Sequence, residues 1–214
     1  MLDVKICGLT NAGDASFALE SGADYLGFVL YKGSPRGIGR EDLRCIVRDL
    51  PDAARCVGVF VNEAPEVIED IVAESNLVAA QLNGDEDSSR FAGISCRIWR
   101  AVRLERDIVS PDPNLWDVER YVVDTAVKGM YGGTGVTADW TLASEFARGK
   151  PVMLAGGLTS ANVVQAVKSV GPAGVDVSSG VESAPGVKDR GAVRDFIQRA
   201  RSAARQGHVT GGKG

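Results

Sequence analysis

Two ionisable side chains stand where an apolar segment gives way to a loop, and they suggest proton-transfer chemistry. Cys7 follows the apolar residues 4–6 and precedes a glycine turn, while Asp124 follows the apolar residues 121–123. In parallel α/β proteins the carboxyl ends of the strands meet on one side of the sheet, where chemistry collects. A thiolate there could act as a general base, provided that its pKa falls from about 8.5 toward neutrality. An aspartic acid on the same side would supply the complementary acid.

Both residues also have plainer interpretations. A free cysteine is often a small buried hydrophobic residue, which is how we interpret Cys45, Cys56 and Cys96. The Asp124 carboxylate could instead cap a helix or form a surface salt bridge. The sequence contains one histidine, His208, in a glycine-rich tail, which disfavours a Cys–His nucleophile, a catalytic triad and a histidine metal site. The cysteines lack CxxC spacing, so we predict neither zinc nor a disulfide framework.

Two loops rich in glycine and serine predict a phosphate site. Residues 154–159 (LAGGLT) end one apolar segment, and residues 175–182 (VDVSSGVE) end the next. Glycines let the backbone N–H groups approach an anion, serines add O–H donors, and a helix N-terminus adds partial positive charge. A plain turn would explain either loop alone, but both together favour phosphate binding. The candidate phosphate-binding residues are Gly156, Gly157, Ser178, Ser179 and Gly180.

Three more charged residues are candidates for the same region. Arg36 follows Ser-Pro in the loop after residues 25–30 and could form a bidentate bond to a substrate carboxylate, although exposed loop arginines are common. Asp176 and Lys5 should lie on neighbouring strands, and we expect them to form an ion pair in the interior of the fold. Asp176 could in addition reach the substrate.

The elements that must position these residues alternate regularly. Apolar segments recur with centres roughly 20 to 30 residues apart, enough for a strand, a helix and two loops, and helical stripes lie between them. The eight segments are residues 4–6, 25–30, 56–61, 78–82, 97–102, 121–123, 152–155 and 174–177. Eight such units predict a single (β/α)8 TIM barrel with eight parallel strands and outer helices. A doubly wound open sheet is the alternative.

Some parts of this plan are irregular. The fifth helix should be short or irregular, because residues 104–119 contain Pro111 and Pro113 and show no clean stripe. The loop at residues 126–137 holds four glycines without GxGxxG spacing, so we interpret it as a lid rather than a nucleotide loop. We predict a barrel over residues 1–206 and a flexible, glycine-rich tail over residues 207–214.

Composition narrows the class of protein further. The chain has 214 residues, 44% of them hydrophobic, and a net charge of −4 at pH 7, without a basic block. We therefore expect no nucleic-acid partner. The first twenty residues carry too many charges for a signal peptide, and no apolar run approaches the roughly 18 residues of a membrane span. We predict a cytoplasmic protein without metal.

Taken together, these motifs resemble those of the phosphoribosylanthranilate isomerase family, small (β/α)8 barrels of tryptophan biosynthesis. The resemblance extends roughly over residues 4–199, and the first and last motifs are its most specific parts. The motifs are residues 5–10 (KICGLT), 34–36 (SPR), 81–82 (QL), 124 (D), 132–135 (GGTG), 156–158 (GGL) and 175–189 (VDVSSGVESAPGVKD).

The resemblance implies an Amadori rearrangement of N-(5-phosphoribosyl)anthranilate to 1-(o-carboxyphenylamino)-1-deoxyribulose 5-phosphate. Cys7 would be the general base that removes the proton from ribose C2′. Asp124 would be the general acid that protonates the furanose ring oxygen. The glycine and serine loops would hold the phosphate of this phosphosugar, and Arg36 would hold the anthranilate carboxylate. The resemblance implies no cofactor, and it favours a monomer, with a homodimer as the alternative.

The chain departs from the family pattern at two positions. Asn83 stands where the family usually has histidine; it can hydrogen-bond the substrate but cannot titrate. Gly37 stands where the family often has an aromatic residue, which removes a possible stacking wall. We expect altered affinity or rate at these positions and no loss of the reaction.

Two other functions compete with this one. The histidine-pathway aminoimidazole carboxamide ribotide isomerase runs the same rearrangement, but that family has aspartate on its first strand and a second phosphate motif in its first half. A non-catalytic barrel that binds a phosphorylated ligand would need neither Cys7 nor Asp124.

Overall fold

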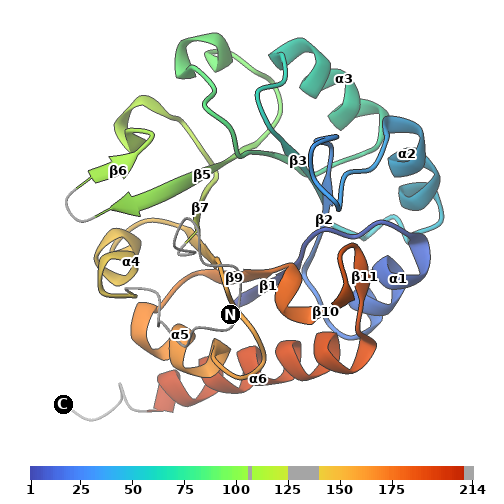
Figure 1. Cartoon of the computed structure of the whole chain (residues 1–214). Coiled ribbons are helices and arrows are strands. Elements are labelled where there is room, and N and C mark those ends of the chain that lie inside the picture. The colour runs from blue at the N-terminus through green and yellow to red at the C-terminus, as the bar shows by residue number, and fades with distance from the viewer. Residues whose placement is uncertain (106–107, 125–139, 210–214) are drawn as a thin grey trace.

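The fold is a closed barrel of eight parallel strands surrounded by helices, as Figure 1 shows. The structure is a computed structural model that describes residues 1–105, 108–124 and 140–209. The barrel strands are β1 (Asp3–Ile6), β2 (Tyr25–Val29), β3 (Cys56–Phe60), β4 (Ala79–Leu82), β5 (Ile98–Glu105), β7 (Arg120–Asp124), β8 (Val152–Ala155) and β9 (Gly174–Val177). The pairing of β4 with β5 closes the ring and excludes an open sheet. The predicted (β/α)8 barrel is therefore confirmed.

The strands follow the apolar segments because both faces of each are covered, one by the barrel interior and one by helices. In β1, Val4, Lys5 and Ile6 are all buried, and alternation directs Lys5 inward. The register places Lys5 beside Tyr25 of β2 on one side and Asp176 of β9 on the other. The inward-facing residues of distant segments are thus brought to the same height.

Six α-helices cover the outside of the barrel in the described part of the chain (Figure 1). They are α1 (Ala12–Glu20), α2 (Arg40–Arg48), α3 (Pro65–Glu74), α4 (Trp140–Ala147), α5 (Val163–Val170) and α6 (Arg190–Val209). Local signals set several ends: the Asn11 side chain caps the Asp14 N–H, Pro65 opens α3, and Gly171 ends α5 with φ +63°. None of the helices described is long and apolar enough to cross a membrane.

In the described residues, the helices of the crossovers after β4 and β5 are short 3-10 helices, η1 (Ser88–Phe91) and η2 (Pro113–Leu115). After β5 the chain folds back as β6 (Ile108–Ser110), antiparallel to the end of β5. The irregular fifth helix was predicted from the prolines. The short fourth crossover was not predicted; residues 83–97 show no apolar stripe that a longer helix could bury.

Beyond β9 the chain forms a small hairpin before α6. After η3 (Ser179–Val181), strands β10 (Glu182–Ala184) and β11 (Val187–Lys188) pair antiparallel. Thr10 Oγ1 donates to the Gly186 carbonyl at 2.6 Å, and the Lys188 N–H donates to Asp14 Oδ2 at 3.0 Å. The hairpin is therefore attached to the loop that follows β1 and to the first turn of α1.

Two apolar clusters stabilise the fold. The larger lies between the strands and the helices. The smaller lies inside the barrel in the N-terminal half of the strands, and we call it the barrel floor. Its members, each at most 2% exposed, are Tyr25, Val57, Ala79, Trp99, Val122 and Met153. The rings of Tyr25 and Trp99 pack edge to face with centroids 4.8 Å apart. The floor fills this part of the barrel, so a pocket inside the barrel must lie above it, at the carboxyl ends of the strands.

Two predictions fall wholly or partly outside the described residues. The loop at residues 126–137, interpreted as a lid, lies entirely outside them. Helix α6 continues to Val209, three residues into the stretch 207–214 that the sequence assigns to a tail, and residues 210–214 lie outside the described part.

Candidate active site

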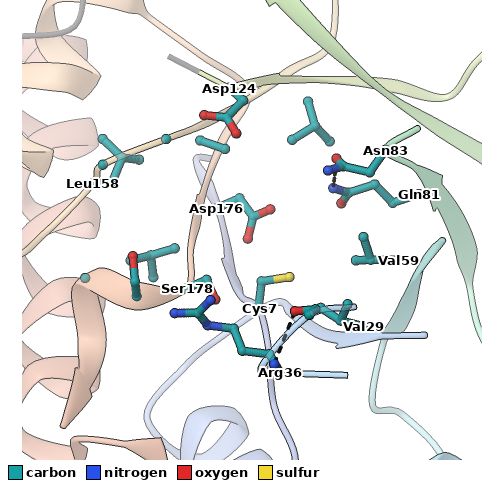
Figure 2. A pocket seen from close by; sticks show the side chains of 18 of the residues that line it. Cys7, Val29, Arg36, Val59, Gln81, Asn83, Asp124, Leu158, Asp176 and Ser178 are labelled. Atoms are coloured by element: carbon teal, nitrogen blue, oxygen red, sulfur yellow. Dashed lines mark hydrogen bonds between the residues drawn. The ribbon is translucent and has the colours of Figure 1, made fainter. Parts of the chain in front are cut away.

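A pocket of about 480 Å³ opens at the carboxyl ends of the barrel strands (Figure 2). Its lining includes every site residue predicted from the sequence: Cys7, Arg36, Asn83, Asp124, Gly156, Gly157, Asp176, Ser178, Ser179 and Gly180. Figure 2 shows the Cys7 thiol and the Asp124 carboxylate directed into this pocket, with Asp176 between them in that view. Segments far apart in the sequence therefore converge on one cavity.

Cys7 lies directly after β1 and is 8% exposed. Its N–H donates to the Val177 carbonyl at 2.8 Å, which extends the β1–β9 pairing by one residue. Gly27 of β2 lies against it, because a Cβ at Gly27 would be only 2.7 Å from Cys7 Sγ and 2.9 Å from Lys5 Cε. The glycine leaves the space that both side chains occupy. It was not among the predicted site residues, although a glycine inside a strand signals close approach.

Lys5 lies beneath Cys7 and holds three polar groups together. Its Nζ donates to Asp176 Oδ2 at 2.8 Å, to Gln81 Oε1 at 2.7 Å and to Cys7 Sγ at 3.5 Å. Lys5 is fully buried and Asp176 is 7% exposed, so the predicted ion pair in the interior is present. Asp176 Oδ1 is buried without a hydrogen-bond partner and belongs to a residue that lines the pocket. That atom has an unused acceptor site.

The electrostatics of this group correct one expectation. Burial raises the pKa of the Cys7 thiol above its ordinary value, although the nearby Lys5 and Lys188 cations oppose the rise. The pKa therefore does not fall toward neutrality. Burial lowers the pKa of Lys5, but Asp176 and Cys7 outweigh burial, so the pKa rises and Lys5 stays a cation. The thiol of the ligand-free protein is protonated, beside a fixed positive charge that favours its anion.

Asp124 is the last residue of β7 and pairs in register with Ala155 at the end of β8. Alternation puts it on the same inward face as Val122 of the barrel floor, one step higher. The sequence predicted this position from the same alternation. Its side chain is exposed to the pocket mouth, unlike the Cys7 thiol at the base.

The two loops after β8 and β9 form one cradle. Gly156 and Gly157 have φ values of +84° and +62°, a conformation that L side chains rarely adopt. A Cβ at Gly180 would be 1.9 Å from the Leu158 carbonyl oxygen, so the loops touch through backbone. Ser178 and Ser179 add hydroxyl groups to the same wall. This surface of backbone amides and hydroxyls suits an anion.

Arg36 reaches the pocket from the loop after β2. Its guanidinium is held by Glu182: Arg36 Nε lies 2.8 Å from Glu182 Oε1, and Arg36 Nη2 lies 2.7 Å from Glu182 Oε2. Lys188 Nζ donates to the same carboxylate at 2.7 Å. Tyr31, in the same loop and 45% exposed, also lines the pocket. Neither Glu182 nor Tyr31 was singled out from the sequence.

Asn83 follows β4 and accepts a hydrogen bond from Gln81 Nε2 at 3.3 Å. Buried Arg100 supports the loop on both sides of it, donating to the Leu82 carbonyl at 2.7 Å and to the Gly84 carbonyl at 2.9 Å. Arg100 also pairs with buried Glu86 at 3.0 Å. At the other departure from the family pattern, a Cβ at Gly37 would lie 2.4 Å from the Tyr31 carbonyl oxygen. The loop conformation therefore requires a residue without Cβ there.

The family model N-(5'phosphoribosyl)anthranilate (PRA) isomerase matches residues 4–199. The chain belongs to this family. It is 45% identical to the N-(5'-phosphoribosyl)anthranilate isomerase of Trichlorobacter lovleyi, over 95% of this chain and 100% of that protein.

Solved structures of phosphoribosyl anthranilate isomerases are similar as well. The enzyme from Thermotoga maritima has a TM-score of 0.85 and 41% identity, covering 94% of this chain and 100% of that one. A complex with reduced 1-(o-carboxyphenylamino)-1-deoxyribulose 5-phosphate has a TM-score of 0.79 and 36% identity, with the same coverage. The chain is therefore an isomerase with the family's TIM barrel, and the predicted family membership is confirmed.

Proposed function

We propose that the chain converts N-(5-phosphoribosyl)anthranilate to 1-(o-carboxyphenylamino)-1-deoxyribulose 5-phosphate in tryptophan biosynthesis, by general acid–base catalysis. The observation that carries the proposal is a single pocket lined by a thiol, a carboxylate and an anion cradle, Cys7, Asp124 and the loops after β8 and β9. The reaction moves protons within one phosphosugar. It therefore needs an acid, a base and an anchor for the phosphate.

Asp124 serves as the general acid. As the furanose ring opens, the ring oxygen takes up a proton and the anthranilate nitrogen becomes part of a Schiff base. Asp124 stands at the mouth of the pocket, on the rim formed by β7 and β8. A carboxylic acid in that position supplies the proton where the ring oxygen leaves C1′.

Cys7 serves as the general base. It takes the proton from C2′ once the Schiff base has made that proton acidic. The thiol must lose its own proton before it can act, and Lys5 Nζ at 3.5 Å supplies the positive charge that favours the thiolate. Because burial raises the pKa of the thiol, the thiolate is a strong base once it has formed. A thiolate stabilised by the Lys5 cation can accept the proton from C2′.

The remaining pocket residues hold the substrate. Gly156, Gly157 and residues 178–180 bind the phosphate through backbone N–H and hydroxyl groups. Arg36 binds the anthranilate carboxylate. Asp176 Oδ1, buried without a partner, accepts a hydrogen bond from a ribose hydroxyl, and Asn83 donates or accepts another.

Steady-state kinetics of Cys7→Ala and Asp124→Asn test the two roles. Each substitution removes one proton-transfer group and should lower kcat by about 10² or more. Cys45→Ala, a cysteine outside the pocket on α2, is the matched control and should leave kcat unchanged. Near-wild-type turnover of either site variant at saturating substrate would show that its assigned role is wrong.

Complementation tests the substrate and the pathway. The gene should restore growth without tryptophan to a strain that lacks phosphoribosylanthranilate isomerase. It should not restore growth without histidine to a strain that lacks the histidine-pathway isomerase. A non-catalytic phosphosugar-binding barrel would restore neither.

We also propose a cellular compartment, an oligomeric state and a cofactor requirement for the enzyme. We place it in the cytoplasm, as a monomer that works without metal or cofactor. Size-exclusion chromatography with light scattering distinguishes the monomer from the alternative, a homodimer.

A further inference from the structure

Arg36 and Glu182 form two hydrogen bonds although they lie 146 positions apart, Arg36 in the loop after β2 and Glu182 at the start of β10. The Glu182 side chain is 4% exposed and that of Arg36 is 22% exposed. Burial raises the pKa of the Glu182 carboxyl, but hydrogen bonds from Arg36 and Lys188 outweigh burial and lower it. The carboxylate is thus an anion fixed between two cations.

The bonding pattern determines which edge of the guanidinium is occupied. A guanidinium carries five N–H donors, one on Nε and two on each Nη. Glu182 uses Nε and Nη2, which form the side fork of Arg36. The outer fork, made by one N–H of each Nη, stays available. A second carboxylate can therefore bind Arg36 end-on while Glu182 keeps the side fork.

The stem of Arg36 is confined as well. A Cβ at Gly8 would lie 2.6 Å from Arg36 Cδ and 2.7 Å from Ser178 Oγ, so the arginine stem packs against the loop after β1 at a residue without a side chain. Figure 2 shows the guanidinium beside Ser178, at the wall that also carries the phosphate cradle. Lys188 Nζ donates to the Glu182 carboxylate at 2.7 Å and to the Ser178 carbonyl at 3.3 Å, and so holds Glu182 beside the same loop.

We propose that Glu182 is a positioning residue for substrate recognition: it locks the Arg36 side fork so that the outer fork faces the pocket and grips the aromatic carboxylate. Lys188 balances the Glu182 charge, so the Arg36 cation remains uncompensated toward the ligand. The inference rests on the proposed contact between Arg36 and the carboxylate. It adds that the contact between Arg36 and the substrate carboxylate depends on Glu182, which does not itself touch the substrate.

Kinetics of Glu182→Gln provide the test, because glutamine keeps the shape and removes the charge. KM should rise about tenfold, since one charge-assisted fork is lost, while kcat should stay within about threefold of wild type. Affinity for the reduced product analogue should fall to a similar extent, whereas affinity for inorganic phosphate should not change. Glu74→Gln is the matched control, because it breaks the exposed Arg40–Glu74 ion pair outside the pocket. It should change neither constant.

The Arg36→Ala background separates positioning from general stability. There Glu182→Gln should cause no further rise in KM beyond about twofold, because a residue that acts through Arg36 has nothing left to position. If Glu182→Gln destabilises the fold, the double variant Glu182→Gln/Lys188→Met restores the charge balance and is measured in its place.

Each failure has a distinct meaning. If Arg36→Ala raises KM and Glu182→Gln does not, the positioning role is wrong and the proposed function stands. Additive effects of the two substitutions would also overturn the positioning role. If Arg36→Ala leaves KM unchanged, the carboxylate contact is wrong, and the role of Glu182 falls with it.

Discussion

Lys5 and Asp176 occupy paired positions on the first and last strands of the barrel, and their side chains meet at 2.8 Å in its interior. The pair links the neighbouring strands β1 and β9 inside the barrel, and Lys5 Nζ also donates to Cys7 Sγ at 3.5 Å. Lys5 Nζ also lies 5.9 Å from the centroid of the Trp99 ring, so the pair rests directly on the barrel floor. An ion pair thus separates the apolar floor from the pocket.

Breaking this pair from one side should be costly. Lys5→Met leaves the Asp176 carboxylate buried without its cation and should lower the free energy of unfolding by about 3–5 kcal/mol. The double variant Lys5→Met/Asp176→Asn removes both charges and should recover much of that loss. Urea unfolding followed by circular dichroism gives both values. Equal stability of the single and double variants would contradict a buried pair held by charge.

The Cys7 thiol should titrate late in the ligand-free protein. Because burial raises its pKa above the ordinary value, its alkylation rate should increase about tenfold per pH unit and show no plateau below pH ~9. Iodoacetamide labelling of Cys7, followed by mass spectrometry, measures this rate.

Removing the charges near Cys7 should shift the titration of its thiol, and the direction should depend on which charge is removed. Asp176→Asn removes a negative charge and should shift the alkylation profile to lower pH, whereas Lys5→Met/Asp176→Asn, which also lacks the cation, should shift it back up. Profiles that coincide for all three proteins would show that the Lys5 charge does not act on the thiol.

Gly27→Ala should damage the site more than the fold. Its Cβ would press on Cys7 Sγ and on the Cys7 backbone, at 2.7 and 3.0 Å, so the base must move. We expect kcat to fall by about 10²-fold, since a displacement near 1 Å costs that much. Gly58→Ala in β3 is the control: its Cβ would meet Leu77 and Phe60 at 2.8 Å, on the helix-facing side. It should lower stability and spare kcat; equal losses of kcat would refute the steric role of Gly27.

Cys56 should make the fold sensitive to alkali. Burial raises its pKa to about 12, whereas a thiol in the unfolded chain titrates near 8.5. Above pH ~8.5 the unfolded chain therefore binds fewer protons than the folded one, and stability falls as the pH rises. By pH ~10 the loss should be roughly 2 kcal/mol.

Urea unfolding at several alkaline pH values measures this dependence, with Cys56→Ala as the comparison. The variant should be less stable at neutral pH because it leaves a small cavity in the core. Between pH ~8.5 and ~10 its stability should fall less steeply than that of the wild type. Parallel curves would show that Cys56 is not the group responsible.

The parts of the fold that sequence could predict are those governed by local pattern. Each barrel strand lies within two or three residues of its apolar segment, because a strand covered on both faces is apolar along most of its length. Prolines at 111 and 113 marked the irregular fifth crossover. Strand alternation placed Asp124 and Lys5 on the inner face. Because the carboxyl ends of the strands converge in a barrel, the sequence could also predict that the candidate site residues would lie around one pocket.

The residues that were missed depend on contacts between distant segments. Glu182 gains its role from Arg36, which enters from a loop 146 positions earlier. Gly27 matters because the register of β1 against β2 sets the Cys7 thiol against it. The direction of the Cys7 pKa shift could not be foreseen either, because it depends on how burial compares with the charge of Lys5. Local periodicity carries none of this information.

The filled barrel floor also determines the route by which substrate enters and product leaves the pocket. Because Tyr25, Trp99 and their neighbours block the axis of the barrel, a ligand in the pocket cannot pass through to the opposite face. Substrate must therefore enter, and product must leave, on the side where the strands end. Substrate and product share one entrance and one pocket, so we expect the product to inhibit the enzyme competitively.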